Sequence, residues 1–250
     1  AVPDQIEAGD GTALPGFLER HRSIVVKPAR GEQGRGIAVG IETLEDAKAA
    51  VETARRECER VLVESCFQGH DLRLVVIDFR LVAAAIRRPP ELTGNGRDTV
   101  RALIGHLSRR RRSATGGESS VPLDAETTRT VKAAGFEMDD VPPEGTRINV
   151  RRTANLHTGG TIHDVTDIVH PKLVEAAIAA ARAIDIPVCG IDFMVEDPTR
   201  DAYVFIEANE RPGLANHEPQ PTAERFIDLL FPLSIPASVR KARLRRKRTN

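Results

Sequence analysis

The sequence predicts an α+β fold made of two successive subdomains. Apolar runs of strand length occur in pairs joined by short turns, as in antiparallel hairpins, and segments with helical spacing separate these pairs. No internal repeat divides the chain, and 250 residues suffice for one large core or two smaller ones. We therefore expect units of sheet and helix that follow one another along the chain.

The N-terminal part is expected to form an entry segment followed by a hairpin. Residues 1–22 are rich in glycine, proline and charge, with only a short helix near Phe17. The core is expected to begin with a β-branched strand at 24–26. A glycine-rich turn at 31–36 can return the chain as a second strand at 37–41.

A helix and a buried strand complete this hairpin region. Thr43 followed by Asp46 resembles a capping box, and apolar residues recur at helical spacing over 44–58. The apolar run 61–64 then predicts a buried strand. These elements form a first α+β unit together with the next hairpin.

The middle of the chain alternates regular elements with polar loops. Apolar runs at 72–77 and 81–86 predict a hairpin. Residues 109–120 contain four consecutive arginines followed by Ser, Gly and Thr, which predicts a mobile loop. A helix is expected at 124–134, and 151–160 is too polar and glycine-rich for a core element, so it predicts a loop.

The C-terminal part predicts a helix, a hairpin and a last helix. Pro171 opens a segment with one apolar face. Strands are expected at 188–195 and 203–208, and a helix at 222–231.

Composition narrows the class of protein. Cationic and anionic side chains balance at 36 each, so the net charge does not favour nucleic acid as a partner. A basic tail at 233–250 is expected to be a solvated, disordered end, with contact to nucleic acid or to a membrane surface as the sharper alternative. Three cysteines without metal-ligand spacing, and no signal peptide or membrane span, predict a cytoplasmic protein without structural zinc.

Three oxygen-bearing side chains form the most informative pattern. Asp192 lies in one strand of the expected hairpin, and Glu207 and Asn209 lie two apart in the other, so all three can share a face. Carboxylates with one neutral amide suit Mg²⁺, which keeps water and phosphate oxygens at its other positions. The alternative is two unrelated acids that are solvated or salt-bridged.

Two further patterns suit a nucleotide. Lys27 precedes the glycine-rich turn, whose backbone amides can approach phosphate oxygens. This turn is not a P-loop, because Lys and Ser/Thr are missing after it. Glu64, Phe67 and Asp71 lie at a strand end where adenine and ribose can be contacted. Taken singly, each has another interpretation: Glu64 as the partner of a helix, Phe67 as a core residue and Asp71 as a turn acid.

Taken in order, these motifs resemble the ATP-grasp superfamily. The resemblance is carried by Val26-Lys-Pro with Gly31, Gly34 and Gly36, then Val63-Glu64 with Gly69 and Asp71, then Gly190-Ile-Asp192, then Glu207-Ala-Asn209 with Pro212-Gly213. Further segments, such as Gly94-Asn-Gly-Arg and 151–160, are similar to segments of the ligase domain of cyanophycin synthetases and of N-acetylglutaminylglutamine synthetase. The residues around Lys27 and Asn209 favour the second enzyme, which makes an osmoprotective dipeptide. The alternative is an amino-acid ligase like cyanophycin synthetase.

The resemblance implies an ADP-forming ligase that makes an amide through an acyl phosphate. It implies ATP and two Mg²⁺ ions, with Mn²⁺ as a substitute, and small-molecule carboxylate and amine partners, with no membrane and with homo-oligomers left open. The implied metal ligands are Asp192, Glu207 and Asn209, and the implied nucleotide contacts are Lys27, Glu32, Gln33, Gly34, Arg35, Gly36, Glu64, Ser65, Cys66, Phe67 and Asp71. Arginines that would neutralise the moving phosphoryl group or clamp a substrate carboxylate are Arg87, Arg152 and Arg211, with Arg73 as a further candidate.

The resemblance also implies the domain division. After the entry segment 1–22, a lid subdomain at 23–90 and a central subdomain with the metal site at 91–232 clamp the nucleotide, and the basic tail follows. Members of the superfamily usually carry an upstream domain and a phosphate-binding lysine before the first strand, and residues 1–26 contain no lysine. We therefore expect this chain to lack part of the active site, with a non-catalytic ATP-binding fragment as the alternative.

Overall fold

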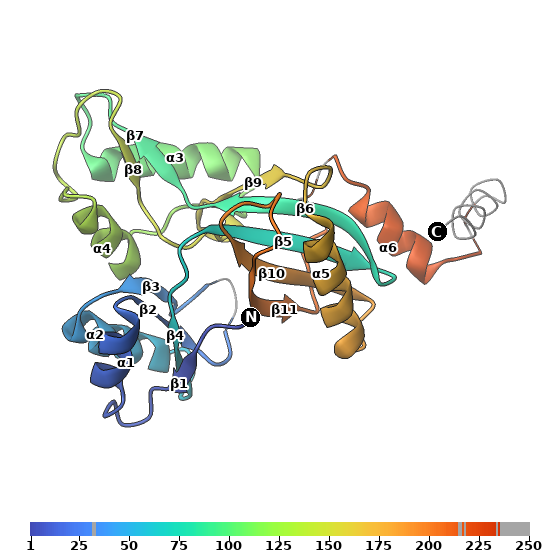
Figure 1. The fold of residues 1–250 in the computed structure, drawn as a ribbon. Helices are drawn as coiled ribbons and strands as arrows, with labels where there is room; N and C mark the ends of the chain where they lie inside the picture. Colours follow the sequence, from blue (N-terminus) through green and yellow to red (C-terminus); the bar gives the residue numbers. More distant parts are fainter. Residues whose placement is uncertain (32–33, 215–216, 218, 234, 236–250) are drawn as a thin grey trace. The chain divides into compact units, whose positions relative to one another are not determined.

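The computed structural model describes all residues except 32–33, 215–216, 218, 234 and 236–250. The chain forms two compact units. The first contains Ala1–Asp71 and Arg87–His163, and the second contains Leu72–Ile86 and Asp164–Asn250. The chain crosses between the units in three strands, β5 (His70–Ile77), β6 (Arg80–Arg88) and β9 (Thr161–Asp164) (Figure 1).

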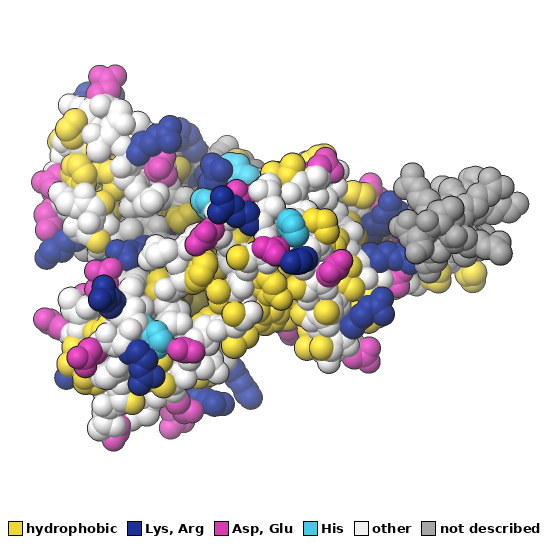
Figure 2. Space-filling view, viewed as in Figure 1, with side chains coloured by type: hydrophobic (Ala, Val, Ile, Leu, Met, Phe, Trp, Pro, Cys, Tyr) yellow, Lys and Arg dark blue, Asp and Glu magenta, His cyan; other side chains and the backbone are white. Residues whose placement is uncertain are grey.

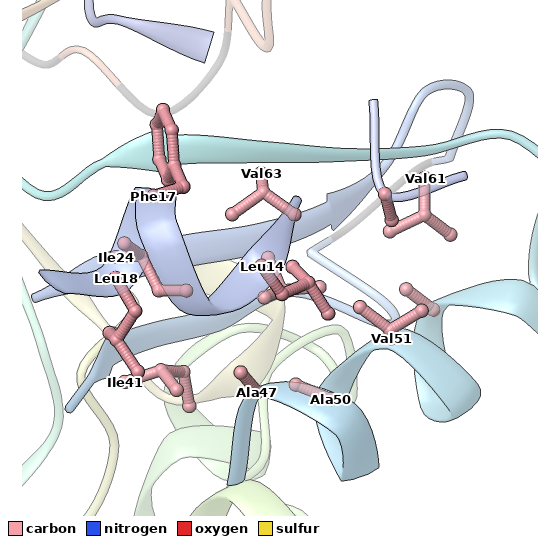
Figure 3. Close-up of a cluster of buried hydrophobic side chains, with 13 residues drawn as sticks. Leu14, Phe17, Leu18, Ile24, Ile41, Ala47, Ala50, Val51, Val61 and Val63 are labelled. Carbon is pink, nitrogen blue, oxygen red and sulfur yellow. The ribbon is translucent and has the colours of Figure 1, made fainter. Parts of the chain in front are cut away.

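The N-terminal part of the first unit is a four-stranded antiparallel sheet with two helices. In sheet order its strands are β1 (Gln5–Glu7), β4 (Val61–Ser65), β2 (Ile24–Pro28) and β3 (Ala38–Ile41). The helices α1 (Leu14–His21) and α2 (Leu44–Arg55) supply apolar side chains that meet those of the strands (Figure 3). The side chain of Thr43 accepts a hydrogen bond from the Asp46 amide, as the capping pattern predicts.

The predicted start of the core is Ile24, but in the structure the core begins earlier in the chain. Leu14, Phe17 and Leu18 are buried in the same cluster as the strands, and β1 pairs with β4. These three residues recur at the spacing of one helix face. The spacing is hard to recognise because the segment around them is rich in glycine and charged residues. Residues 1–22 are therefore part of this core rather than an entry segment.

The rest of the first unit is built on two longer helices and a small sheet. The elements are β7 (Glu91–Thr93) paired with β8 (Arg147–Asn149), α3 (Val100–Ala114), α4 (Ala125–Ala133) and the 3-10 helix η1 (Leu156–Thr158), after which β9 leads into the second unit. Residues 151–160 otherwise form a loop, as expected.

The arginine run is helical, so the prediction of a loop at 109–120 is wrong for its first half. Thr99 caps α3, and Val100, Leu103, Ile104 and Leu107 bury one face of it. The four arginines continue the helix with side chains that are exposed or half-buried. Arginine is a good helix former, and one buried face is enough to extend the helix through it.

The second unit packs a helix on a hairpin-rich sheet. The sheet order is β11-β10-β5-β6-β9, with β10 at Val188–Val195 and β11 at Val204–Asn209. Asp78 and Phe79 have φ of 54° and 53°, the left-handed conformation of a tight hairpin turn between β5 and β6. Buried side chains of α5 (Pro171–Ala183) pack on β5 and β10, and α6 (Thr222–Leu230) follows.

Charged side chains of both signs are interspersed on the face that Figure 2 shows, in keeping with the balanced composition. Among the residues that the structure describes, no helix is both long enough and apolar enough to cross a bilayer.

Candidate functional site

The three predicted metal ligands lie together on the β10–β11 hairpin. In the antiparallel register Asp192 faces Glu207 and Gly190 faces Asn209. Asn209 Nδ2 donates a hydrogen bond of 2.9 Å to Glu207 Oε1. Asp192 is 3 % exposed, whereas Glu207 is open to solvent. The hairpin therefore presents one buried and one exposed carboxylate with an amide beside them.

Arg73 holds the buried carboxylate of this hairpin. Its Nε and Nη2 donate to the two oxygens of Asp192, with 2.8 Å between Nη2 and Oδ2. A Cβ at position 190 would lie 2.9 Å from Arg73 Nη1, so Gly190 leaves the space through which the guanidinium reaches Asp192. The resemblance implies Arg73 as a candidate that neutralises the phosphoryl group or clamps a substrate carboxylate, and it does not predict this pairing.

This donor set fits a magnesium ion. Each carboxylate oxygen has two lone pairs, so Asp192 can accept from Arg73 and still offer a lone pair to a cation. Asn209 donates through nitrogen to Glu207, which leaves its oxygen for coordination. Within the described part of the chain there is no cluster of three or more His, Cys, Asp or Glu side chains suited to a metal. The third protein ligand here would thus be the amide oxygen.

Lys27 and Glu64 form an ion pair on adjacent strands of the first unit. Lys27 Nζ lies 2.8 Å from Glu64 Oε1, and the side chains are 18 % and 10 % exposed. Lys27 is on β2 and Glu64 on β4, which pair directly. The predicted phosphate lysine and the predicted adenine-side acid therefore lie together, and each holds the other's charge in a partly buried position.

The strand end after Glu64 is anchored by backbone hydrogen bonds. The Ser65 amide donates to the Asp4 carbonyl at 2.9 Å, and the Asp4 amide donates to the Ser65 hydroxyl oxygen at 3.1 Å. The Cys66 amide donates to the Ser23 carbonyl at 3.0 Å. Ser65, Cys66 and Phe67 are all half-buried. This stretch is therefore held in place while part of its surface stays open.

Asp71 and Arg87 form a second ion pair in the first unit. Arg87 Nε and Nη2 donate to Asp71 Oδ1 at 2.9 and 2.7 Å. Asp71 was predicted to contact ribose and Arg87 a phosphoryl group or carboxylate. The structure places the two predicted residues against each other at the ends of β5 and β6.

The remaining predicted residues are dispersed. Gly34 and Gly36 have φ of 73° and 70°, which glycine adopts without strain, and Arg35 lies 3.7 Å from Glu57. Glu32 and Gln33 lie outside the described residues. Arg211 is exposed after β11.

Arg152 has a partner that the sequence did not indicate. Its Nη1 donates to the Gly40 carbonyl at 2.9 Å. Its neighbour Arg151 is 4 % exposed and pairs with Asp124 at 2.7 Å.

A family model described as the RimK-like ATP-grasp domain matches residues 146–228. The matched segment contains Asp192, Glu207 and Asn209. The chain is 36 % identical over 222 residues to the cyanophycin synthetase of Nostoc sp., covering 84 % of this chain and 25 % of that protein. It is 29 % identical to the bifunctional glutathione biosynthesis protein GshAB of Clostridium perfringens, covering 86 % of this chain and 29 % of the relative. The chain thus spans about a quarter of the length of these curated relatives.

Solved structures share the fold. The bifunctional glutathione synthetase of Pasteurella multocida matches with a TM-score of 0.54 and 25 % identity, over 92 % of this chain and 34 % of that one. The D-alanine--D-alanine ligase of Bacillus anthracis matches with a TM-score of 0.55 and 12 % identity, over 93 % and 62 % of the two chains.

Proposed function

This chain belongs to the ATP-grasp superfamily, and from that premise we propose that it binds ATP with magnesium and joins a carboxylate to an amine. One observation carries the proposal. Asp192, Glu207 and Asn209 converge on one hairpin inside the segment that the RimK-like family model matches. Hard oxygen donors at that place suit a cation that accompanies a triphosphate.

The proposed reaction has two steps. A substrate carboxylate oxygen attacks the terminal phosphorus of ATP, the bond to the bridging oxygen breaks, and ADP leaves. The amine then attacks the carbonyl carbon of the acyl phosphate, loses a proton and expels inorganic phosphate, which gives the amide. Both steps develop negative charge on phosphoryl oxygens, so they gain from fixed cationic groups.

The residues of this chain supply binding and charge. Bound magnesium, as two ions for which Mn²⁺ can substitute, would be held by Asp192, Glu207 and Asn209 and would offset phosphate charge. Lys27 and the turn 32–36 would face the phosphates, the stretch 64–67 adenine, and Asp71 ribose. Of the three predicted arginines, Arg87 and Arg211 are the proposed contacts of the phosphoryl group or of the substrate carboxylate, whereas the Arg152 guanidinium donates to the Gly40 carbonyl of β3.

For the substrates, the relatives favour the amino-acid ligase alternative. The residues around Lys27 and Asn209 favour synthesis of N-acetylglutaminylglutamine, whereas the curated relatives include cyanophycin synthetase at 36 % identity. We therefore propose small-molecule carboxylate and amine partners in the cytoplasm, with an amino-acid ligase like cyanophycin synthetase ahead of the dipeptide synthetase.

A thermal-shift titration with ADP and Mg²⁺ tests the proposal. A ligand at about a hundred times its dissociation constant adds roughly 2.7 kcal/mol to stability, which raises the melting temperature of a chain of this size by about 5 °C or more. With Glu207→Gln, which keeps the shape of an exposed side chain, we expect ADP to stabilise equally with and without Mg²⁺.

The matched control is Glu196→Gln, an exposed acid just after β10. It should keep the full extra shift that Mg²⁺ gives the unaltered chain. A chain that ADP does not stabilise at all would refute nucleotide binding. A Glu207→Gln chain with an unchanged magnesium increment would refute the metal site.

A further inference from the structure

The outer strand of the N-terminal sheet is held by two arginines from a distant part of the first unit. β3 lies at the edge of the sheet, after β2. Arg129 Nη2 donates to the Val39 carbonyl at 3.1 Å, and Arg152 Nη1 donates to the Gly40 carbonyl at 2.9 Å. An edge strand has carbonyls without a strand partner on one side. Here two consecutive carbonyls accept from guanidinium groups.

Position 40 is shaped for this contact. The β2–β3 register passes from Ile24 opposite Ile41 to Val25 opposite Val39, so Gly40 is the extra residue of a bulge. Its φ is 67°, and a Cβ built there would lie 1.6 Å from Arg152 Nη1. Only glycine therefore combines this backbone turn with the bound guanidinium.

Glu126 organises both arginines. Its Oε2 lies 2.6 Å from Arg129 Nη2, one turn further along α4, and its Oε1 accepts from the Arg152 amide at 3.4 Å. The Glu126 side chain is only 8 % exposed. This buried carboxylate therefore orients the Arg129 guanidinium directly and bonds Arg152 through its backbone amide.

A cavity lies beside these bonds. It has a volume of about 390 Å³ and is lined by residues of the hairpin, of α2 and of α4, such as Ile37, Ala50 and Ala125. The arginine bonds on this side add to the packing of Ile24 and Ile41 in the core of the sheet. The turn itself also approaches the loop 151–160, because a Cβ at Gly34 would lie 3.5 Å from Asn155 Nδ2.

We propose that Arg129 and Arg152, both bonded to Glu126, are a latch that positions the β2–β3 hairpin and with it Gly34 and Gly36 of the glycine-rich turn. In this role Arg152 is a positioning residue and not a catalytic residue. The inference rests on the proposed function for its effect on nucleotide binding, since the turn matters only if it faces phosphates. The latch itself is independent of any nucleotide.

Amide hydrogen exchange tests the latch without nucleotide. We expect faster exchange over 24–41 in Arg129→Met and Arg152→Met, because releasing either carbonyl lets the hairpin open more often. Glu126→Gln should act in the same direction, although it touches neither carbonyl. Arg152→Lys keeps one donor and should restore part of the protection. Arg110→Met, an exposed arginine of the same unit, is the matched control.

Binding of ADP with Mg²⁺ to the same variants tests the consequence. Losing one charge-assisted hydrogen bond of about 1.4 kcal/mol corresponds to roughly tenfold weaker binding if that bond is needed to position the turn. We expect this loss in Arg152→Met and Glu126→Gln, partial recovery in Arg152→Lys, and less than about a twofold change in Arg110→Met.

The outcomes separate the two proposals. Unchanged exchange over 24–41 in both arginine variants would overturn the latch and leave the ligase proposal intact. Weaker ADP binding with unchanged exchange would also overturn it, because that result assigns Arg152 to direct contact. If the unaltered chain fails to bind ADP, the ligase proposal fails, and exchange alone decides the latch.

Discussion

Arg73 shows what a single side chain contributes to the candidate metal site. It reaches Asp192 from β5, the strand beside β10, and both of its bonds to the carboxylate are made in a largely buried place. A carboxylate with 3 % exposure needs such a partner, since burying a charge alone is expensive. Arg73 therefore orients one of the predicted metal ligands.

Replacing Arg73 should destabilise the second unit. Arg73→Met leaves the Asp192 carboxylate buried without this cation, and removing one member of a buried pair costs about 3 kcal/mol. The free energy of unfolding measured in urea should be lower by that amount. The comparison variant is Arg80→Met, whose exposed ion pair with Asp78 at 3.8 Å should contribute less than about 0.5 kcal/mol. Equal losses in the two variants would mean that Arg73 is not the partner that Asp192 requires.

The sequence could predict the metal acids but not their arginine. Glu207 and Asn209 share a face because alternate residues of a strand do, and a short connection places Asp192 opposite. Arg73 is 119 residues away from Asp192 along the chain. Its place depends on which strand lies beside β10, and periodicity within β5 contains no information on that neighbour.

The helix α3 forms in a segment whose composition is typical of a loop. Four arginines and a following glycine-rich stretch suggested a loop, yet the helix runs to Ala114. Its C-terminal turns keep basic residues, which the helix dipole favours there. Ser108 Oγ also accepts from the Val121 amide, which ties the helix to the chain that follows it.

Proline at position 110 distinguishes a helix from a loop. In a helix interior it removes a hydrogen bond and clashes with the preceding turn, so Arg110→Pro should lower the free energy of unfolding by about 3 kcal/mol. Arg110→Ala keeps the helix and should be nearly neutral. Guanidinium unfolding measures both. If proline were tolerated as well as alanine, the arginine run would be a loop after all.

At the scale of the whole molecule, the chain passes repeatedly between two units. Residues 72–86 belong with 164–250, although the sequence analysis placed them in a lid subdomain ending at 90. The strands β5 and β6 extend across this division. The candidate nucleotide residues and the candidate metal ligands therefore fall in different units, and the hairpin of β5 and β6 links them covalently.

The pH dependence of global stability should carry a contribution from His163. Acidic and basic residues balance at 36 each, so individual groups matter more than the net charge. Burial lowers the pKa of His163 below 6.5, and Arg88 and Arg111 lower it further. The unfolded chain therefore binds this proton more readily, and stability falls as the pH drops below about 6.5 towards the folded pKa.

Replacing His163 should flatten that decline. In His163→Gln the free energy of unfolding should decrease less between pH 7 and pH 5 than it does in the unaltered chain. His70→Gln, which removes an exposed histidine, is the control. Denaturant titrations at several pH values give the slopes. A slope that both variants leave unchanged would show that His163 titrates alike in the folded and unfolded chain.

The sequence by itself determined most elements and the superfamily. Strand runs, the cap at Thr43 and the proline that opens α5 act over a few residues, so they can be recognised without tertiary contacts. The order of lysine, glycine turn and acids is likewise a property of the chain alone.

Only the tertiary structure decided which residues meet. It joined Lys27 to Glu64, Asp71 to Arg87, Arg73 to Asp192, and the carbonyls of β3 to Arg129 and Arg152. It also brought α1 into the core. The physical reason is that these pairings depend on strand order and on how distant segments pack, and neither is encoded in the local spacing of residues.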